Sequence, residues 1–113
     1  MPKTKTITQA KAKTNFRILL RAVAYRHGAW WIAHCLELDL VAEGKTLQEA
    51  LADVMDLSCS QIEAAIRDGD LESVFRPAPP EAWAMFSRAT DIPVKQKPTC
   101  PVERFEAREA VLV

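Results

Sequence analysis

The chain has 113 residues, of which 49% are hydrophobic, and its formal net charge is zero. This length fits one domain with a single modest core. A zero net charge gives no overall attraction to nucleic acid or to membranes. The sequence also holds no apolar run of the roughly 18 residues that a membrane-spanning helix needs, so we expect no membrane association.

The charged residues and the cysteines are unevenly placed along the chain. Residues 1–26 hold seven basic and no acidic residues, whereas residues 36–72 hold ten acidic and two basic ones. Residues 1–15 are rich in lysine and threonine with little to bury, which predicts a mobile basic arm. The three cysteines are widely spaced and no signal peptide precedes them, so we expect a cytoplasmic protein with reduced thiols. Cys35 and Cys59 are then interpreted as small buried hydrophobes.

Residues 16–25 alternate between two kinds of side chain, which predicts a first strand. Residues 26–29 supply a turn in which Gly28 is free to take a positive φ. The inward face of the strand carries Phe16, Ile18, Leu20, Ala22 and Ala24, and the other face is mixed.

Two adjacent tryptophans, Trp30 and Trp31, lie in the second predicted strand, residues 30–35. Neighbouring residues on a strand point to opposite faces, so the two indoles cannot share one core. His34 is the polar side chain of this strand and lies on the face of Trp30 and Ile32. We therefore predict that Trp31 points into the core and that Trp30 points outward.

A third strand and a long helix follow. Residues 38–43 alternate again, and helical spacing of apolar residues begins after them. Thr46 with Glu49 three residues later predicts a capping box, in which the threonine oxygen accepts a backbone N–H and the glutamate reaches back to the N–H of Thr46. Gly69 suits the left-handed end of this helix of about 20 residues.

Prolines divide the rest of the chain. Pro80 suits a helix start, and a short second helix over residues 80–89 would present Trp83 and Phe86 to the body of the protein. Residues 91–113 combine a proline-rich linker with a tail that alternates like a strand, although residues 102–110 also suit a turn or two of helix.

Together these elements predict an α+β domain over residues 16–90. It consists of a three-stranded antiparallel sheet with one long helix on one face and the short second helix, and the C-terminal strand follows it within residues 91–113.

No group of residues predicts catalysis or metal binding. His34 and Cys35 are adjacent on a strand and point apart, so they cannot easily grip one ion. Asp39 and Glu43 would stand about 13 Å apart along their strand. We therefore interpret Glu37, Asp39 and Glu43 as a solvated charged surface. The chain is predicted not to be an enzyme, with no catalytic residue, metal site or cofactor.

A binding surface is the strongest functional feature of the sequence. The outward strand face is apolar, and such a patch usually meets a partner. The helix beside it carries Glu49, Asp53, Asp56, Glu63 and Asp68, and an acidic surface attracts basic partners. The predicted partner or oligomer interface consists of Tyr25, Trp30, Ile32, His34 and Val41.

The stretches "WWIAHCLELDLVAEGKTLQEALADV" and "FRPAPPEAW" resemble the HicB-like antitoxin family, over about residues 16–90. The resemblance implies a β-β-β-α-β domain, a truncated ribonuclease-H-like layer without that fold's catalytic carboxylates. It implies neutralisation of a small basic RNA-cleaving toxin of the HicA type, and self-association to a dimer or higher. Residues 91–113 are too short and proline-rich for the C-terminal DNA-binding domain of many members, so we do not expect direct DNA binding by this chain alone.

Two other functions compete with the antitoxin hypothesis. One is a solitary, self-associating HicB-like protein with a regulatory or small-ligand-binding role and no toxin partner. The other is a residual nuclease. A neighbouring gene for a short, basic, histidine-containing protein separates the antitoxin from the solitary protein, and metal-dependent RNA cleavage by the pure protein would indicate the nuclease.

Overall fold

A computed structural model describes residues 18–112 of the chain; the predicted basic arm, residues 1–15, lies outside these residues. None of the helices within 18–112 has the length and apolar character needed to cross a membrane. The elements are, in chain order, β1 (Leu19–His27), β2 (Trp30–Cys35), β3 (Leu40–Gly44), α2 (Leu47–Arg67), the 3-10 helix η1 (Leu71–Val74), α3 (Pro80–Ser87), β4 (Thr90–Ile92) and β5 (Arg104–Glu109).

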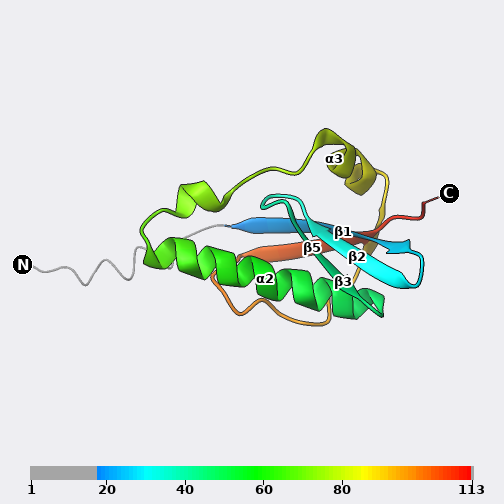
Figure 1. Ribbon diagram of the computed structural model, residues 1–113, viewed down its shortest axis with the longest axis horizontal. Helices are drawn as coiled ribbons and strands as arrows, with labels where there is room; N and C mark the ends of the chain where they lie inside the picture. The colour runs from blue at the N-terminus through cyan, green and yellow to red at the C-terminus, as the bar shows by residue number, and fades with distance from the viewer. Residues whose placement is uncertain (1–17, 113) are drawn as a thin grey trace, which may run out of the picture.

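The strands form one mixed sheet in the order β3-β2-β1-β5-β4 (Figure 1). β1, β2 and β3 form the predicted antiparallel meander, β5 lies parallel to β1, and β4 is antiparallel to β5. The α+β class is confirmed, but the prediction of a three-stranded sheet is wrong because the sheet has five strands. The strand-like tail adds β5, and β4 lies in a segment predicted to be linker. Three residues next to a proline are too short for a recognisable alternation.

The helix α2 covers one face of the sheet, and the residues of the first strand predicted to point inward lie beneath it, except Phe16, which lies outside the described residues. Ile18, Leu20, Ala22 and Ala24 are buried there, together with apolar residues of α2. β3 approaches the start of α2 so closely that a Cβ on Gly44 would lie 2.5 Å from the backbone nitrogen of Ala50, which explains a glycine at this position.

Both ends of α2 have the predicted kind of cap. The Glu49 N–H donates to Thr46 Oγ1 at 3.1 Å. The reciprocal bond differs from the prediction, because Glu49 Oε1 accepts from the N–H of Lys45, at 3.0 Å, instead of that of Thr46. At the other end Gly69 takes φ 69°, and the N–H of Asp70 reaches back to the carbonyl of Ala65 at 2.9 Å. This is the Schellman arrangement that a left-handed glycine permits.

The short helix α3 lies against the opposite face of the sheet from α2 (Figure 1). Phe86 and Ala82 of α3 are buried with Val23 of β1 in a second cluster. The Trp83 indole N–H donates to the carbonyl of Ala78 at 3.1 Å, which ties the helix to the segment before it. The prediction that α3 presents Trp83 and Phe86 to the body is confirmed. α3 covers part of the outward sheet face that the sequence interpretation assigned to a partner.

Two of the three cysteines contradict the prediction of reduced thiols, and the third agrees with it. Cys59 of α2 forms a disulfide with Cys100, whose Cα lies 5.2 Å away, and Cys35 is free and buried. The sequence separation of 41 residues hides this pair, since only the return of the chain between β4 and β5 along α2 brings the two together.

Candidate binding surface

The structure brings the five predicted interface residues onto one face of β1, β2 and β3. Tyr25 pairs with Ile32, and His34 pairs with Val41, across neighbouring strands. Directly paired residues of adjacent strands share a face. Trp30 belongs to the same face because it lies two residues before Ile32 on β2. We call the surface formed by Tyr25, Trp30, Ile32, His34 and Val41 the tryptophan surface.

Solvent reaches the members of the tryptophan surface to different extents. Trp30 is 43% exposed and Val41 is 52% exposed, which is high for large apolar side chains. Tyr25 and His34 are partly buried, and Ile32 is only 8% exposed. Trp30 and Val41 are therefore the side chains that a partner can reach first, and Ile32 supports them from beneath.

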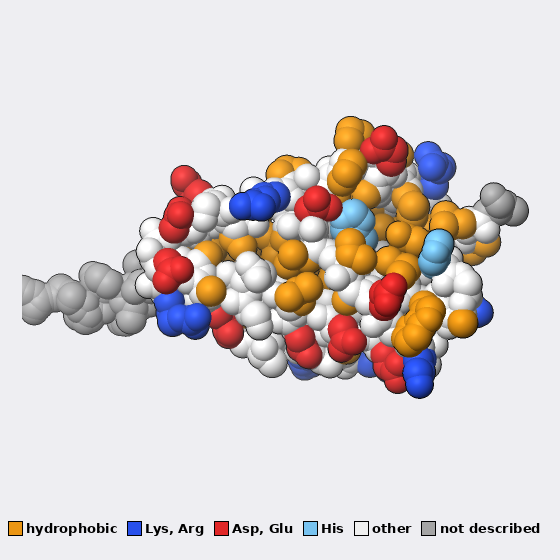
Figure 2. Space-filling model, in the orientation of Figure 1, with side chains coloured by type: hydrophobic (Ala, Val, Ile, Leu, Met, Phe, Trp, Pro, Cys, Tyr) orange, Lys and Arg blue, Asp and Glu red, His pale blue; other side chains and the backbone are white. Residues whose placement is uncertain are grey.

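The tryptophan surface is the part of its sheet face that α3 leaves uncovered. Tyr25 packs at the edge of the cluster that α3 forms with Val23, so it borders both regions. Figure 2 shows hydrophobic side chains gathered around the two pale-blue histidines, with acidic side chains along α2. The result is an apolar strip with an acidic helix on one side.

The tryptophan surface also borders an open edge of the sheet. β3 stands at one end of the strand order, and no strand within residues 18–112 pairs with its outer edge. An open edge presents backbone N–H and C=O groups to which an extended segment of another chain can pair.

A histidine–aspartate contact shapes the connection from β2 to β3. The imidazole Nε2–H of His34 donates to Asp39 Oδ1 at 2.7 Å. Asp39 takes φ 54°, in the left-handed region that Asp tolerates better than most residues. The contact fixes the ring of His34 within the tryptophan surface. Within the described part of the chain, no group of three or more His, Cys, Asp and Glu side chains is placed to hold a metal ion.

Glu37 is the residue whose environment the sequence interpretation missed. Its side chain is only 16% exposed, so it is not part of a solvated charged surface, whereas Asp39 and Glu43 are exposed as predicted. Glu37 Oε1 accepts the backbone N–H of Arg21 at 2.7 Å. Oε2 lies 3.4 Å from the Nε of Arg21 but accepts no hydrogen bond from the described residues. Burial raises the pKa of the Glu37 carboxyl above its ordinary value, and the contacts with Arg21 oppose this in part.

The Arg21 guanidinium connects Glu37 to α3. It lies 5.5 Å from the ring centre of Trp83, within the range of a cation–π contact. Arg21, Glu37 and Trp83 therefore hold together β1, the β2–β3 connection and α3. A strand-by-strand interpretation of the sequence could not join these three residues, because they belong to three separate segments.

Comparisons of the chain with protein-family models, with curated proteins and with solved structures gave no match.

Proposed function

We propose that this chain is an antitoxin-like, protein-binding module without enzymatic activity, and that it neutralises a small basic RNA-cleaving protein of the HicA type by covering its active surface. The exposure of Trp30 and Val41 beside the open edge of β3 is the observation that carries the proposal. The order of the main elements, three antiparallel strands, a long helix and a returning strand, supports the HicB-like resemblance.

Each part of the surface has a separate role in binding. Trp30 and Val41 serve as apolar anchors, and an indole of this kind contributes about 2 kcal/mol or more where it becomes fully buried in an interface. The edge of β3 pairs with an extended segment of the toxin, which fixes the orientation of the complex. The acidic side chains of α2 attract a basic toxin and speed its association.

Inspection of the neighbouring genes for one that encodes a short basic protein, followed by co-expression of that protein with this chain, tests the proposal. The wild-type chain is expected to relieve the growth arrest that the toxin causes. Trp30→Ala and Val41→Asp should bind the purified toxin at least about 30-fold more weakly, which corresponds to about 2 kcal/mol. Leu57→Ala is the control, because Leu57 is also exposed but lies on α2, across the sheet. A neighbouring gene that encodes no such protein, or unchanged binding by both variants, would contradict the proposal.

The second candidate is a solitary, self-associating relative that binds a small ligand. An open cavity of about 300 Å³ favours it, because its wall combines apolar side chains with the charged Asp68 and Arg76. This cavity lies between the second half of α2, η1 and the start of β3. In that case the β3 edges of two copies would pair. A dimer that Val41→Asp dissociates, with no toxin gene nearby, would favour this candidate.

A further inference from the structure

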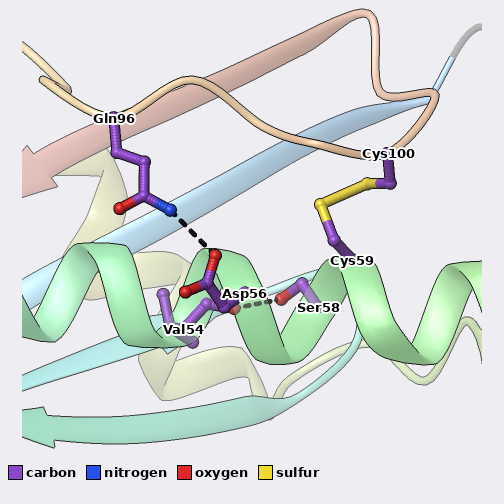
Figure 3. The surroundings of a disulfide bond; sticks show 6 residues. All are labelled: Val54, Asp56, Ser58, Cys59, Gln96 and Cys100. Atoms are coloured by element: carbon purple, nitrogen blue, oxygen red, sulfur yellow. Dashed lines mark hydrogen bonds between the residues drawn. A yellow bond between two sulfur atoms is a disulfide. The ribbon is translucent and has the colours of Figure 1, made fainter.

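The connection between β4 and β5, residues 93–103, runs beside α2, and we call it the strap. Val94, Cys100 and Val102 of the strap pack against the core on the α2 side. Figure 3 shows two of its attachments to the helix. Gln48 of α2 makes two hydrogen bonds with the strap: its Nε2 donates to the Pro93 carbonyl (3.1 Å), and its Oε1 accepts from the Lys95 N–H (3.3 Å). Gln96 Nε2 of the strap donates to Asp56 Oδ1 of α2 (2.8 Å). The disulfide between Cys59 and Cys100 is the fourth attachment.

The two sulfur-bearing residues of this disulfide differ in access to solvent. Cys59 is 3% exposed and belongs to α2, whereas Cys100 is partly exposed and lies on the strap between two exposed residues. A thiolate that opens a disulfide must reach one of its sulfur atoms from outside. Access therefore favours attack on the sulfur of Cys100, with the sulfur of Cys59 as the leaving group.

The third cysteine is kept out of this exchange. Cys35 is fully buried, and burial raises the pKa of its thiol from 9.0 to about 11. Because the thiolate is the nucleophile, a thiol with so high a pKa reacts slowly at neutral pH. The chain thus holds one exchangeable pair and one inert thiol.

We propose that the Cys59–Cys100 disulfide is a reversible thiol-exchange site that a low-molecular-weight thiol opens at Cys100, releasing the strap from α2. In the first step the incoming thiolate forms a new bond to the sulfur of Cys100, the Cys59–Cys100 bond breaks, and Cys59 leaves as a thiolate that takes a proton from water. In the second step another external thiolate attacks the sulfur of the first one in the mixed disulfide. The two external thiols form a disulfide, and Cys100 leaves as a thiolate that takes a proton from water. One external disulfide forms for each Cys59–Cys100 pair reduced, and the same external disulfide can reverse both steps.

Release is confined to the strap because both of its ends remain fixed. β4 pairs with β5, and β5 pairs with β1, through backbone hydrogen bonds that need no sulfur. Without the disulfide, Val94 and Val102 still pack against the core near the two ends of the strap, and three polar contacts with α2 that are exposed to water remain. Such exposed contacts contribute little to holding a segment in place.

Adduct mapping on the folded wild-type protein tests the first step. The oxidised protein is treated with reduced glutathione, quenched in acid, and analysed by mass spectrometry. The adduct is expected on Cys100, at least about ten-fold in excess over Cys59, since access decides which sulfur is attacked. The variant Cys35→Ser should give the same result. Equal adducts on Cys59 and Cys100, or participation of Cys35, would contradict the proposal.

Limited trypsin digestion tests the release of the strap. Lys95 is exposed and precedes Gln96, whereas the bond after Lys97 resists trypsin because a proline follows. Reduction should accelerate cleavage after Lys95 by about ten-fold or more, because proteases cut segments that open locally. Cys100→Ser should be cleaved rapidly whether or not a reductant is present. Equal cleavage of the oxidised and reduced wild-type protein, with the fold intact by circular dichroism, would show that the disulfide does not control the strap.

Discussion

The two faces of the sheet are covered in different ways. On one face, the 21-residue helix α2 buries a continuous cluster of apolar side chains from all three strands of the meander. On the other face, the eight-residue helix α3 buries a smaller cluster around Val23 and shares the face with charged residues such as Arg21 and Arg108. A helix of that length spans only about 12 Å. It therefore cannot cover the whole face, and the tryptophan surface is what remains.

The adjacent tryptophans show this difference within a single dipeptide. Trp31 faces α2, where it is partly buried at the edge of the core with the Arg26 guanidinium 5.5 Å from its ring centre. Trp30 faces the side of α3 but lies beyond its reach, and it stays exposed. The alternation of the strand assigns opposite faces to the two indoles, and the lengths of the two helices decide how much of each is covered.

Removal of the Cys59–Cys100 disulfide is expected to have the largest effect on stability. The disulfide joins α2 to the strap, which follows α3 and β4 in the chain. The loop that it closes contains η1, α3 and β4. For a sequence separation of 41 residues, the loss of the cross-link should lower the free energy of unfolding by about 4 kcal/mol. Urea denaturation of the oxidised protein and of Cys100→Ser measures this. A difference below about 1 kcal/mol would mean that the unfolded loop is already restricted.

The next largest effect should separate the two tryptophans. Trp31→Ala removes a partly buried indole beneath α2 and should lower the free energy of unfolding by about 2–3 kcal/mol, less than for a fully buried one. Trp30→Ala should change it by less than about 0.5 kcal/mol, as expected for an exposed side chain. Thermal and urea denaturation of both variants measure the difference. Larger destabilisation by Trp30→Ala would show that the α3 face also depends on this indole.

The α2 face could be predicted from sequence because its determinants are local. Strand alternation, helical spacing and the residues Thr46, Glu49 and Gly69 each lie within one element or at its end. The α3 face could not be predicted to the same extent. Glu37 lies half-enclosed where Arg21 of β1 contacts it, and Cys59 meets Cys100 only because the strap returns along α2. Such contacts depend on how segments that are distant in the sequence are arranged in space, and local sequence patterns do not indicate this arrangement.

The N-terminal cap of α2 gives a smaller effect, and it tests the α2 face alone. Thr46→Ala removes the acceptor of the Glu49 N–H and should lower the free energy of unfolding by about 1 kcal/mol. α3 begins at Pro80, and its N-cap residue Pro79 makes no side-chain cap, so no corresponding variant exists on the other face. Thr99→Ala, at an exposed position of the strap, is the control. A denaturation midpoint equal to that of the wild type would argue against the capping box.

The smallest expected effect is a pH dependence of the free energy of unfolding, which arises from Glu37 on the α3 face. Burial raises the pKa of Glu37 in the folded protein, while Arg21 opposes the shift and the nearby Glu106 adds to it. A raised pKa means that the folded state holds the proton more tightly than the unfolded state does. The stabilisation from the neutral carboxyl is therefore complete below the ordinary value of 4.5 and is lost as the pH rises above it.

Glu37→Gln keeps the shape of the side chain and removes its titration. The free energy of unfolding of this variant should rise relative to that of the wild type as the pH increases from about 4.5 to 7. The altered contact with Arg21 adds a difference that does not depend on pH, so it does not change this slope. Urea midpoints at several pH values measure the slope. Glu43→Gln controls for the loss of one negative charge at an exposed position of the same sheet. A slope of opposite sign would mean that the ion pair with Arg21 outweighs burial, and the centre of the α3 face would then be held together by charge as much as by packing.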